Sequence, residues 1–162
     1  MPISLPSKTT YHLGVIADTH GYLPATALQS FRKVDAILHA GDVGSNEILA
    51  ALGQLAPVVA VRGNMDSGPW ANALAERESV RIGDRFVYII HDLMKLRPDA
   101  IRGDCLAVVA GHTHRGSIER RNGVLYLNPG SAGAPRHGEF PCVAIVHVSG
   151  AQASAELVPV AD

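Results

Sequence analysis

The fold is decided by a stretch near the start of the chain, residues 13–20, which reads LGVIADTH. Its first five residues include Val15 and Ile16 and have the composition of a buried strand. Three polar residues, Asp18, Thr19 and His20, follow at once. The stretch therefore predicts a β-strand that ends in a loop rich in groups able to bind a ligand.

The same succession of an apolar run and a polar cluster occurs six times. The apolar runs are residues 13–17, 36–40, 58–61, 86–90, 106–110 and 124–127. The polar clusters that follow them are residues 18–20, 41–42, 62–66, 91–92, 111–114 and 128–131. If the strands share an edge at their carboxyl ends, these loops converge on one crevice, which is where ligands bind in open α/β sheets.

The segments between the runs indicate the fold class. Residues 24–31 and 45–52 have helical character, with Ser45 placed to cap the second helix, and this is the spacing of β-α-β units. From about Ser79 onward the runs lie closer together, with hairpin turns expected at residues 82–85 and 121–123. We therefore predict an α/β fold with a mixed sheet system, whose second half is more antiparallel than its first.

The composition is that of a soluble globular protein. Of the 162 residues 47% are hydrophobic and 18% are charged, with a formal net charge of -1. Since this length fits one domain, we expect a single domain over residues 1–162, with a core at about 11–148 and tails at 1–9 and roughly 152–162. The balanced charge gives no overall attraction to nucleic acid or to an anionic membrane, so neither association is expected.

The cysteines and the first residues favour a cytoplasmic location. Cys105 and Cys142 lack a C-x-x-C spacing and have the character of small buried hydrophobic residues. Residues 1–9 contain no continuous apolar segment of the kind found in export signals, and no run elsewhere approaches the length needed to span a membrane. We predict a cytoplasmic protein.

The polar clusters contain seven side chains that can bind a metal ion: two carboxylates, one amide and four imidazoles. They are Asp18, His20, Asp42, Asn64, His91, His112 and His114. This mixture suits transition metals, because calcium prefers an all-oxygen cage and structural zinc prefers thiolates. Seven donors are too many for one four-coordinate ion but suit two ions that share a carboxylate. We therefore predict a binuclear centre.

A binuclear centre of this kind is suited to hydrolysis. Two ions about 3.5 to 4 Å apart polarise a phosphoryl group and lower the pKa of a bound water. Ions without an open coordination position would only stabilise the fold, and the residues alone leave that alternative open.

In this order the motifs resemble those of the calcineurin-like metallophosphoesterases, and in particular the small prokaryotic phosphodiesterases of that superfamily. The resemblance extends over residues 13 to about 147. The matching motifs are Asp18-x-His20, Gly41-Asp42, Gly63-Asn64-x-Asp66, His91, Gly111-His112-Thr113-His114 and Asn128-Pro129-Gly130-Ser131. The fold that this resemblance implies is a two-sheet mixed β-sandwich flanked by helices.

The resemblance also implies how the donors divide between two divalent ions. The first ion would be held by Asp18, His20 and His114. The second would be held by Asn64, His91 and His112, and Asp42 would bridge the two. Mn²⁺ is the first choice for these ions, with Ni²⁺, Fe²⁺, Co²⁺ and Zn²⁺ as alternatives. The family attacks its ester with a metal-bound hydroxide, here near Asp42, so no side-chain nucleophile is required.

Two positions depart from the family pattern. Many members have a histidine directly after the Gly-Asn pair, where it helps to protonate the leaving group, whereas this chain has Met65. Loss of a general acid typically costs about 10² to 10⁴ in rate, so we expect modest activity or a preference for good leaving groups. The other departure is Asp92, where a glycine is common, and this carboxylate is expected to pair with a cation or to perturb the site.

The other polar residues have less specific roles. His39 is expected beside the metal ligands rather than among them, and Asp66 is expected either to orient a ligand or to cap a turn. Arg115 and Arg136 are candidates for binding a substrate phosphate, although solvated surface arginines are commoner. The stretch 128–131 has the composition of a turn, and the resemblance places Ser131 near the metals. No role is expected for the remaining histidines, His12, His137 and His147.

We predict a metal-dependent phosphoesterase that hydrolyses phosphodiesters, with monoesters as a second class, in a shallow site without a lid. A small ester is the expected substrate, because no long insertion interrupts the motifs. The rival hypothesis is a catalytically weak protein-interaction scaffold, since the same fold resembles a retromer subunit. Retention of all seven donors favours the enzyme. The sequence neither supports nor excludes a homo-oligomer.

Overall fold

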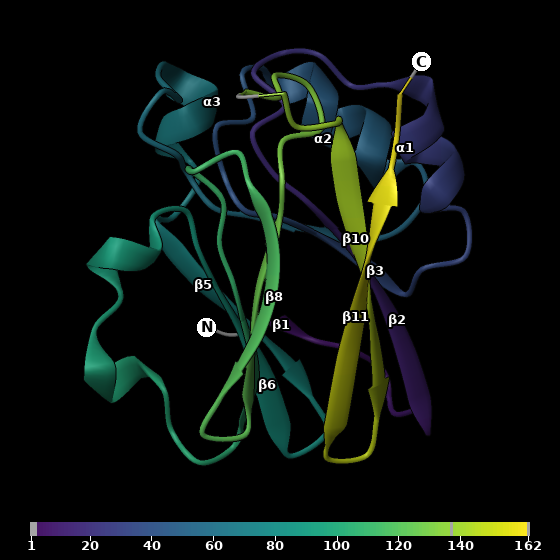
Figure 1. Ribbon diagram of the computed structural model, residues 1–162, viewed down its shortest axis with the longest axis vertical. Coiled ribbons are helices and arrows are strands. Elements are labelled where there is room, and N and C mark those ends of the chain that lie inside the picture. Colours follow the sequence, from purple (N-terminus) through teal and green to yellow (C-terminus); the bar gives the residue numbers. More distant parts are fainter. Residues whose placement is uncertain (1–2, 137, 162) are drawn as a thin grey trace.

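The structure, a computed structural model, describes residues 3–136 and 138–161 and consists of two β-sheets packed face to face (Figure 1). His137, for which no role was expected, lies outside the described residues. The strands are β1 (Ile3–Ser4), β2 (Thr10–Ile16), β3 (Ala36–His39), β4 (Val58–Ala60), β5 (Arg77–Ile82), β6 (Arg85–Ile90), β7 (Cys105–Val109), β8 (Gly116–Arg121), β9 (Val124–Pro129), β10 (Cys142–Ser149) and β11 (Gln152–Pro159). The helices are α1 (Ala25–Ser30), α2 (Asn46–Gly53) and α3 (Pro69–Asn72), with 3₁₀ turns η1 (Leu93–Lys95) and η2 (Pro98–Ala100).

Both sheets are mixed, which confirms the predicted fold class. One sheet has the strand order β1-β5-β6-β7-β9-β8 and the other β11-β10-β2-β3-β4. The parallel strands are β2, β3 and β4 in the five-stranded sheet and β6, β7 and β9 in the six-stranded sheet. All six predicted apolar runs lie in these parallel strands. Among the described residues, every antiparallel pair involves a strand of the second half, namely β5–β6, β8–β9, β10–β11 and β10–β2, whereas β2, β3 and β4 pair in parallel. The second half is therefore more antiparallel than the first, as predicted. It also contains the parallel pair β6–β7, because residues 91–104 return the chain to the same end of the sheet before β7 begins.

The main core lies between the two sheets and is built from the inward-facing side chains of both, such as Leu13, Val15, Val87 and Ile89. A second cluster forms where α1 and α2 cover the outer face of the five-stranded sheet, with Phe31 and Leu52 among its buried members. The outer face of the six-stranded sheet is covered by η1, η2 and the loops around them. The α-helices therefore flank one sheet and not both.

The segments at the two ends of the chain belong to the sheets, so the expectation of tails is wrong. β1 pairs with β5. β11 pairs with β10 through eight residue pairs, from Ser149–Gln152 to Cys142–Pro159. Ala153 of β11 is buried in the main core and Ala155 packs against that core. The alternation that buries them is built from small alanines, which give a weak hydrophobic signal in the sequence.

The local features of the connections follow the predictions closely. The two hairpin turns are present, and Asn122 and Gly123 in the second have positive φ angles of 51° and 81°. α1 and α2 lie within one residue of the predicted helical segments. Ser45 occupies the N-cap position of α2, but its side chain makes no capping hydrogen bond. No helix in the described part of the chain is both long and apolar enough to cross a membrane.

Candidate metal centre

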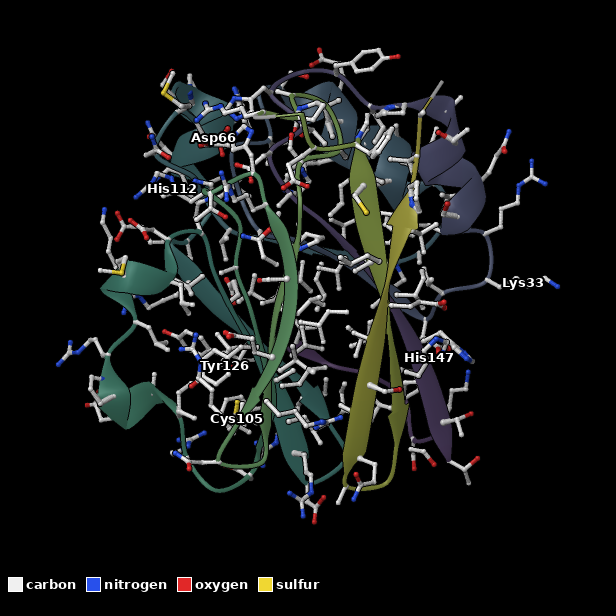
Figure 2. The ribbon with its side chains drawn as sticks, in the orientation of Figure 1. Lys33, Asp66, Cys105, His112, Tyr126 and His147 are labelled. Atoms are coloured by element: carbon white, nitrogen blue, oxygen red, sulfur yellow. The ribbon has the colours of Figure 1, made fainter. Side chains whose placement is uncertain are left out.

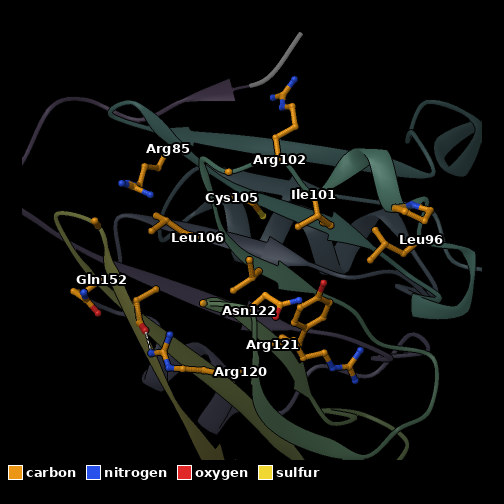
Figure 3. A pocket seen from close by; sticks show the side chains of 17 residues that line it. Arg85, Leu96, Ile101, Arg102, Cys105, Leu106, Arg120, Arg121, Asn122 and Gln152 are labelled. Carbon is orange, nitrogen blue, oxygen red and sulfur yellow. Dashed lines mark hydrogen bonds between the residues drawn. The ribbon is translucent and has the colours of Figure 1, made fainter.

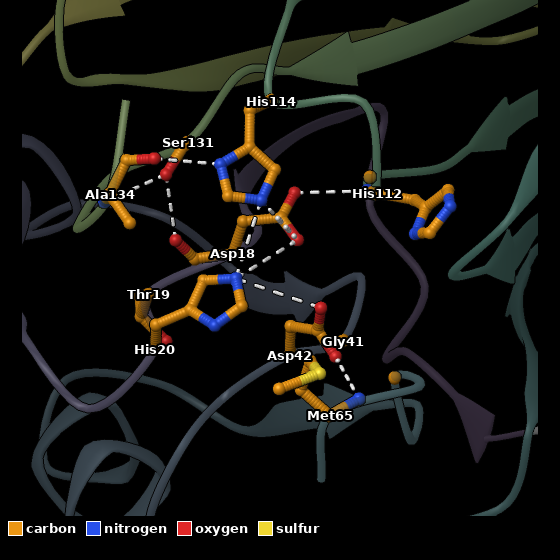
Figure 4. Close-up of polar contacts among 12 residues, drawn as sticks. Asp18, Thr19, His20, Gly41, Asp42, Met65, His112, His114, Ser131 and Ala134 are labelled. Carbon is orange, nitrogen blue, oxygen red and sulfur yellow. Dashed lines mark hydrogen bonds and ion pairs between the residues drawn. The ribbon is translucent and has the colours of Figure 1, made fainter. Parts of the chain in front are cut away.

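The structure brings all seven predicted donors together at one end of the sandwich, beyond the carboxyl ends of β2, β3, β4, β6 and β7. Figure 4 shows Asp18, His20, Asp42, His112 and His114, which come from three of these strand ends. Because parallel strands of one sheet end at the same edge, loops that are far apart in the sequence meet there.

The first group of donors consists of Asp18, His20 and His114. Asp18 Oδ1 lies 3.8 Å from His20 Nε2 and 3.6 Å from His114 Nε2, and the two imidazole nitrogens are 3.3 Å apart. His114 Nδ1 donates a hydrogen bond to the Ala134 carbonyl at 2.7 Å, which leaves Nε2 as the nitrogen with a free lone pair. Three donor atoms therefore face a common point.

Asp42 lies between this group and the next. Its Oδ2 is 3.6 Å from His20 Nε2 and 3.3 Å from His91 Nε2, and its Oδ1 accepts a hydrogen bond from the Met65 backbone N–H at 2.8 Å. Asp18, Asp42 and His91 offer ligand atoms that all lie within 4.8 Å of one another. Asp42 therefore faces donors of both groups.

The second group contains Asn64, His91 and His112. Asn64 Oδ1 lies 2.9 Å from His91 Nε2 and 3.2 Å from His112 Nδ1. His91 Nδ1 donates to the Ala40 carbonyl at 2.7 Å, so Nε2 is the nitrogen that faces the group. These contacts join the loops that follow β4, β6 and β7.

The backbone is strained at the same positions. Among the described residues, six non-glycine residues have positive φ angles, and five of them belong to the donor set. The five are Asp18, His20, Asp42, His112 and His114, with φ between 48° and 74°. Strained backbone conformations concentrate at functional sites, where the surrounding structure holds them in place.

Asp66 and His39 are buried next to the donor loops and make hydrogen bonds within them. Asp66 is buried, and its carboxylate accepts hydrogen bonds from the N–H groups of Val43, Gly44 and Gly63 at 3.2, 3.0 and 2.9 Å. It therefore ties the loop containing Asp42 to the loop containing Asn64. His39 is fully buried, where Nδ1 accepts from the Gly41 N–H at 3.1 Å and Nε2 contacts the Thr19 hydroxyl at 3.0 Å.

Residues 128–131 hold two of the donor loops in place through hydrogen bonds. Asn128 donates from its amide to the Gly111 carbonyl and to the Thr113 hydroxyl, both at 3.0 Å, and so fixes the loop that contains His112 and His114. Ser131 Oγ donates to the Asp18 carbonyl at 2.8 Å and accepts from the Ala134 N–H at 2.8 Å. These contacts place Ser131 directly behind Asp18.

Burial perturbs the titration of several donors. It raises the pKa of Asp18 to about 7. Burial alone would raise the pKa of Asp42 and lower that of His91, but the hydrogen bond and charge interaction between the two reverse both directions. Burial lowers the pKa of His114, and the positive charge of Arg136 adds to the effect. The protonation states of Asp42 and His91 therefore depend on each other.

Several polar residues stand outside the donor set. His12 and His147 lie together on neighbouring strands of the five-stranded sheet, with ring centroids 4.9 Å apart. Arg136 acts on Asp18 and His114 only through its charge, and Arg115 contributes no side-chain contact to the donors within the described residues. The structure assigns neither arginine to a phosphate.

Two features of the site have no signal in the sequence motifs. The carbonyls of Ala40 and Ala134 orient His91 and His114, and a backbone carbonyl has no residue-type signature. Asp92 accepts from the Met94 N–H through Oδ1 at 3.0 Å and places Oδ2 3.9 Å from His112 Nε2. Asp92, the second departure from the family pattern, therefore lies near an imidazole of the donor set.

The site fits divalent metal ions on its own geometry. Asp18 Oδ1 is buried and has no hydrogen-bond partner, although buried polar atoms nearly always have one. The hydrogen bonds of His91 and His114 turn the free nitrogens toward the carboxylates, as metal-binding histidines do. A cation between these atoms would satisfy all of them.

Comparison with known proteins agrees with this geometry. A probable metallophosphoesterase of Methanothermobacter thermautotrophicus is 36% identical over 157 residues, which cover 90% of this chain and 91% of the relative. A phosphodiesterase of Methanocaldococcus jannaschii is 30% identical over 136 residues, 73% of this chain and 82% of the relative. The solved structure of Vps29 from Chaetomium thermophilum has the same fold, with a TM-score of 0.75, 19% identity and coverage of 91% and 97% of the two chains.

The family model of the calcineurin-like phosphoesterase superfamily domain matches residues 11–151. That range includes every donor of the site and, apart from Thr10 at the start of β2, the strands that position them. By its sequence, its two mixed sheets and its group of metal donors, the chain belongs to the calcineurin-like phosphoesterase superfamily.

Proposed function

We propose that the chain hydrolyses small phosphodiesters, with monoesters as a second class, and that seven donors hold two divalent ions, Mn²⁺ foremost. The observation that supports this most is the position of Asp42 Oδ2, 3.6 Å from His20 Nε2 and 3.3 Å from His91 Nε2. A carboxylate that faces two donor groups is what a pair of ions sharing one ligand requires.

The two groups of contacts correspond to the two ions. Asp18, His20 and His114 would hold one ion, and Asn64, His91 and His112 the other. Asp42 would contact both. When bound, the ions would supply Lewis acidity, which lowers the pKa of water and offsets negative charge on the phosphoryl oxygens.

The chain itself positions the reaction and supplies no nucleophile. Cys105 lies at the start of β7, at the far end of that strand from His112, and burial raises the pKa of its thiol to about 11. The carbonyls of Ala40 and Ala134 hold His91 and His114 in the orientation that directs Nε2 toward the ions. Water is therefore the proposed attacking group.

The shape of the site favours small esters. A hollow of about 80 Å³ beside Asn64, His91 and His112 is lined by Arg62, Lys95 and other polar residues. This volume accommodates the end of a small ester and not an extended polymer. The Methanocaldococcus jannaschii relative is named a phosphodiesterase, which supports the diester class.

The scaffold hypothesis is not favoured. All seven donors are present and their free atoms face one another, which a protein-binding surface alone would not require. The cytoplasmic location, the lack of a stable nucleic-acid complex and the single domain stay predictions, and the oligomeric state stays open.

The first experiment is hydrolysis of bis(p-nitrophenyl) phosphate by metal-stripped protein with and without added Mn²⁺. We expect turnover only with metal, and a fall of at least about a hundredfold in Asp42→Asn, because loss of the shared carboxylate removes a contact to both ions. Asp99→Asn is the matched control, since this carboxylate is exposed on η2.

Two results would count against the enzyme. Equal activity of Asp42→Asn and Asp99→Asn would show that the hydrolysis does not depend on this site. Absence of turnover with Mn²⁺, Ni²⁺, Co²⁺ and Zn²⁺ in protein that demonstrably binds them would favour the scaffold.

A further inference from the structure

A second and larger hollow lies at the end of the sandwich opposite the metal centre. It has a volume of about 910 Å³, near the upper end of the range for small-molecule sites. It opens where β6, β7 and β9 begin, at Arg85, Cys105 and Val124. Because β7 runs from Cys105 toward His112, the two sites are separated by a strand length, roughly 20 Å. Figure 2 shows Cys105 and His112 toward opposite ends of the six-stranded sheet.

The hollow concentrates positive charge. Its lining contains Arg85, Arg102, Arg120 and Arg121 and no aspartate or glutamate. Figure 3 shows Arg85 and Arg102 on one side of the hollow and Arg120 and Arg121 on the other. The whole chain has a formal net charge of -1, so the positive charge of this lining is a local property of the surface.

Two of these arginines are held in place by neighbours, which partly neutralise them. Arg121 lies over the Tyr126 ring, 4.6 Å from its centroid, and pairs with Glu119 at 2.7 Å. Arg102 lies over the Phe86 ring at 5.1 Å and has Asp104 at 3.7 Å. These contacts fix where the two guanidinium groups lie.

The other two arginines retain their full charge for a ligand. Among the described residues, the ion pairs do not include Arg85 or Arg120. Arg120 donates to the Ala153 carbonyl, which holds it near the β10–β11 hairpin and leaves donors unused. Arg85 makes no side-chain hydrogen bond in the described part of the chain. The planar fork of arginine matches the oxygens of a phosphate group.

Apolar side chains lie between the arginines. Leu96, Ile101, Leu106 and Tyr126 line the hollow together with Cys105, whose thiol stays neutral because burial raises its pKa to about 11. Inorganic phosphate alone would leave this apolar surface uncovered. A ligand that joins several negative charges to an apolar or aromatic group would use both kinds of surface.

We propose that this hollow binds a small organic polyphosphate, the class to which nucleoside di- and triphosphates belong. The phosphate groups lie among the four arginines, and the organic group lies on the apolar surface between them. The proposal does not depend on hydrolysis or on metal, because the hollow shares no lining residue with the seven donors.

Calorimetric titration of metal-free protein in EDTA tests this proposal, with ATP, inorganic triphosphate, adenosine and a short single-stranded DNA as probes. We expect ATP to bind with a stoichiometry of one, triphosphate to bind more weakly and adenosine not to bind. Arg85→Gln/Arg120→Gln should weaken ATP binding by at least about tenfold, because each change removes a hydrogen bond to a charged group.

The matched control is Arg32→Gln/Lys33→Gln, which removes two positive charges outside the lining and should leave ATP binding unchanged. If the double variant in the hollow fails to fold, Arg85→Gln alone tests the same point, since that side chain makes no hydrogen bond or ion pair among the described residues.

Amide shifts at Cys105 and Gly123, at two sides of the hollow, should accompany binding to the native chain. Equal ATP affinity in the hollow variant and the control would overturn the proposal. So would equal affinity for triphosphate and ATP, or binding of the DNA without binding of ATP.

Discussion

Asp18 combines two conditions that oppose each other in the absence of a ligand. Its Oδ1 is buried without a hydrogen-bond partner, and burial raises the pKa of the carboxyl to about 7. Ionised, the group holds a charge away from water with a hydrogen bond only to Oδ2, from the His112 N–H at 2.9 Å, which is costly. A divalent cation next to Oδ1 would remove this cost and leave the carboxyl ionised. The environment of Asp18 therefore suits a bound metal ion.

Met65 provides the first test of a single residue. Its backbone N–H holds Asp42 Oδ1, while its side chain is 66% exposed and supplies no proton. Met65→His should keep the backbone contact and add a general acid. We expect kcat/KM for an alkyl phosphodiester, whose leaving group needs a proton, to rise by roughly 10². The p-nitrophenyl ester should gain little, and an equal gain for both esters would argue against proton donation.

His39 provides the second test of a single residue. Burial lowers its pKa to about 3, whereas an unfolded histidine titrates near about 6.5. Above pH 6.5 both states are neutral and the full stability is present. Below it only the unfolded chain takes up the proton, so the free energy of unfolding should fall by about 1.4 kcal/mol per pH unit. Urea denaturation of metal-free protein at pH 7.5, 6.5 and 5.5 measures this slope.

The His39→Gln variant should lose this contribution and show a shallower dependence on pH. His147→Gln is the control, because His147 pairs with Glu156 on the surface and has no comparable burial. A slope unchanged in His39→Gln would mean that other groups cause the pH dependence.

The loops that follow β3 and β4 act as one unit. Asp66 accepts hydrogen bonds from both, and Gly63 lies against Asp42. A Cβ atom at position 63 would lie 2.2 Å from both the N and the Oδ1 of Asp42, which no real side chain tolerates. The distance between these two loops is therefore set by a residue without a side chain.

Gly63→Ala should displace Asp42 and separate the two loops. A misplacement of about 1 Å at a reacting centre costs roughly 10² in rate, so we expect a loss of this order in kcat/KM and weaker Mn²⁺ binding. Gly53→Ala is the matched control, since nothing lies within 4 Å of its Cβ position at the end of α2. If both variants bind Mn²⁺ like the native chain, the loops adapt and the contact does not position Asp42.

The metal centre connects most of the molecule, because its donors come from strands of both sheets. An ion that binds only the folded state stabilises it, by about 2.7 kcal/mol at a hundred times the dissociation constant. For a chain of this size that corresponds to a rise of roughly 5 to 10 °C in Tm. Calorimetry with and without Mn²⁺ measures it, and Asp42→Asn should show a smaller rise. An unchanged Tm at saturating Mn²⁺ would show that binding is not coupled to folding.

The features that could be predicted from the sequence are those that depend on the types of side chain present. Each donor belongs to a polar cluster that follows an apolar run, so Asp18 and His91, which come directly after their runs, could be placed at strand ends from the sequence. β11 was not predicted as a strand because the residues that it packs against the core are the small Ala153 and Ala155, which give a weak hydrophobic signal. The backbone carbonyls that orient the imidazoles, and the arginines gathered at the starts of strands, follow from the path of the chain and not from any local motif.

The left-handed backbone at five of the donors restricts how the family can change over generations. Asp, Asn and His adopt that conformation more readily than other residues with side chains, and glycine adopts it freely. Residues that bind metal at these positions, Asp and His, are thus also among those that tolerate a positive φ angle. A descendant that no longer needs metal should exchange these residues first for asparagine or glycine, and should keep its fold after its chemistry is gone.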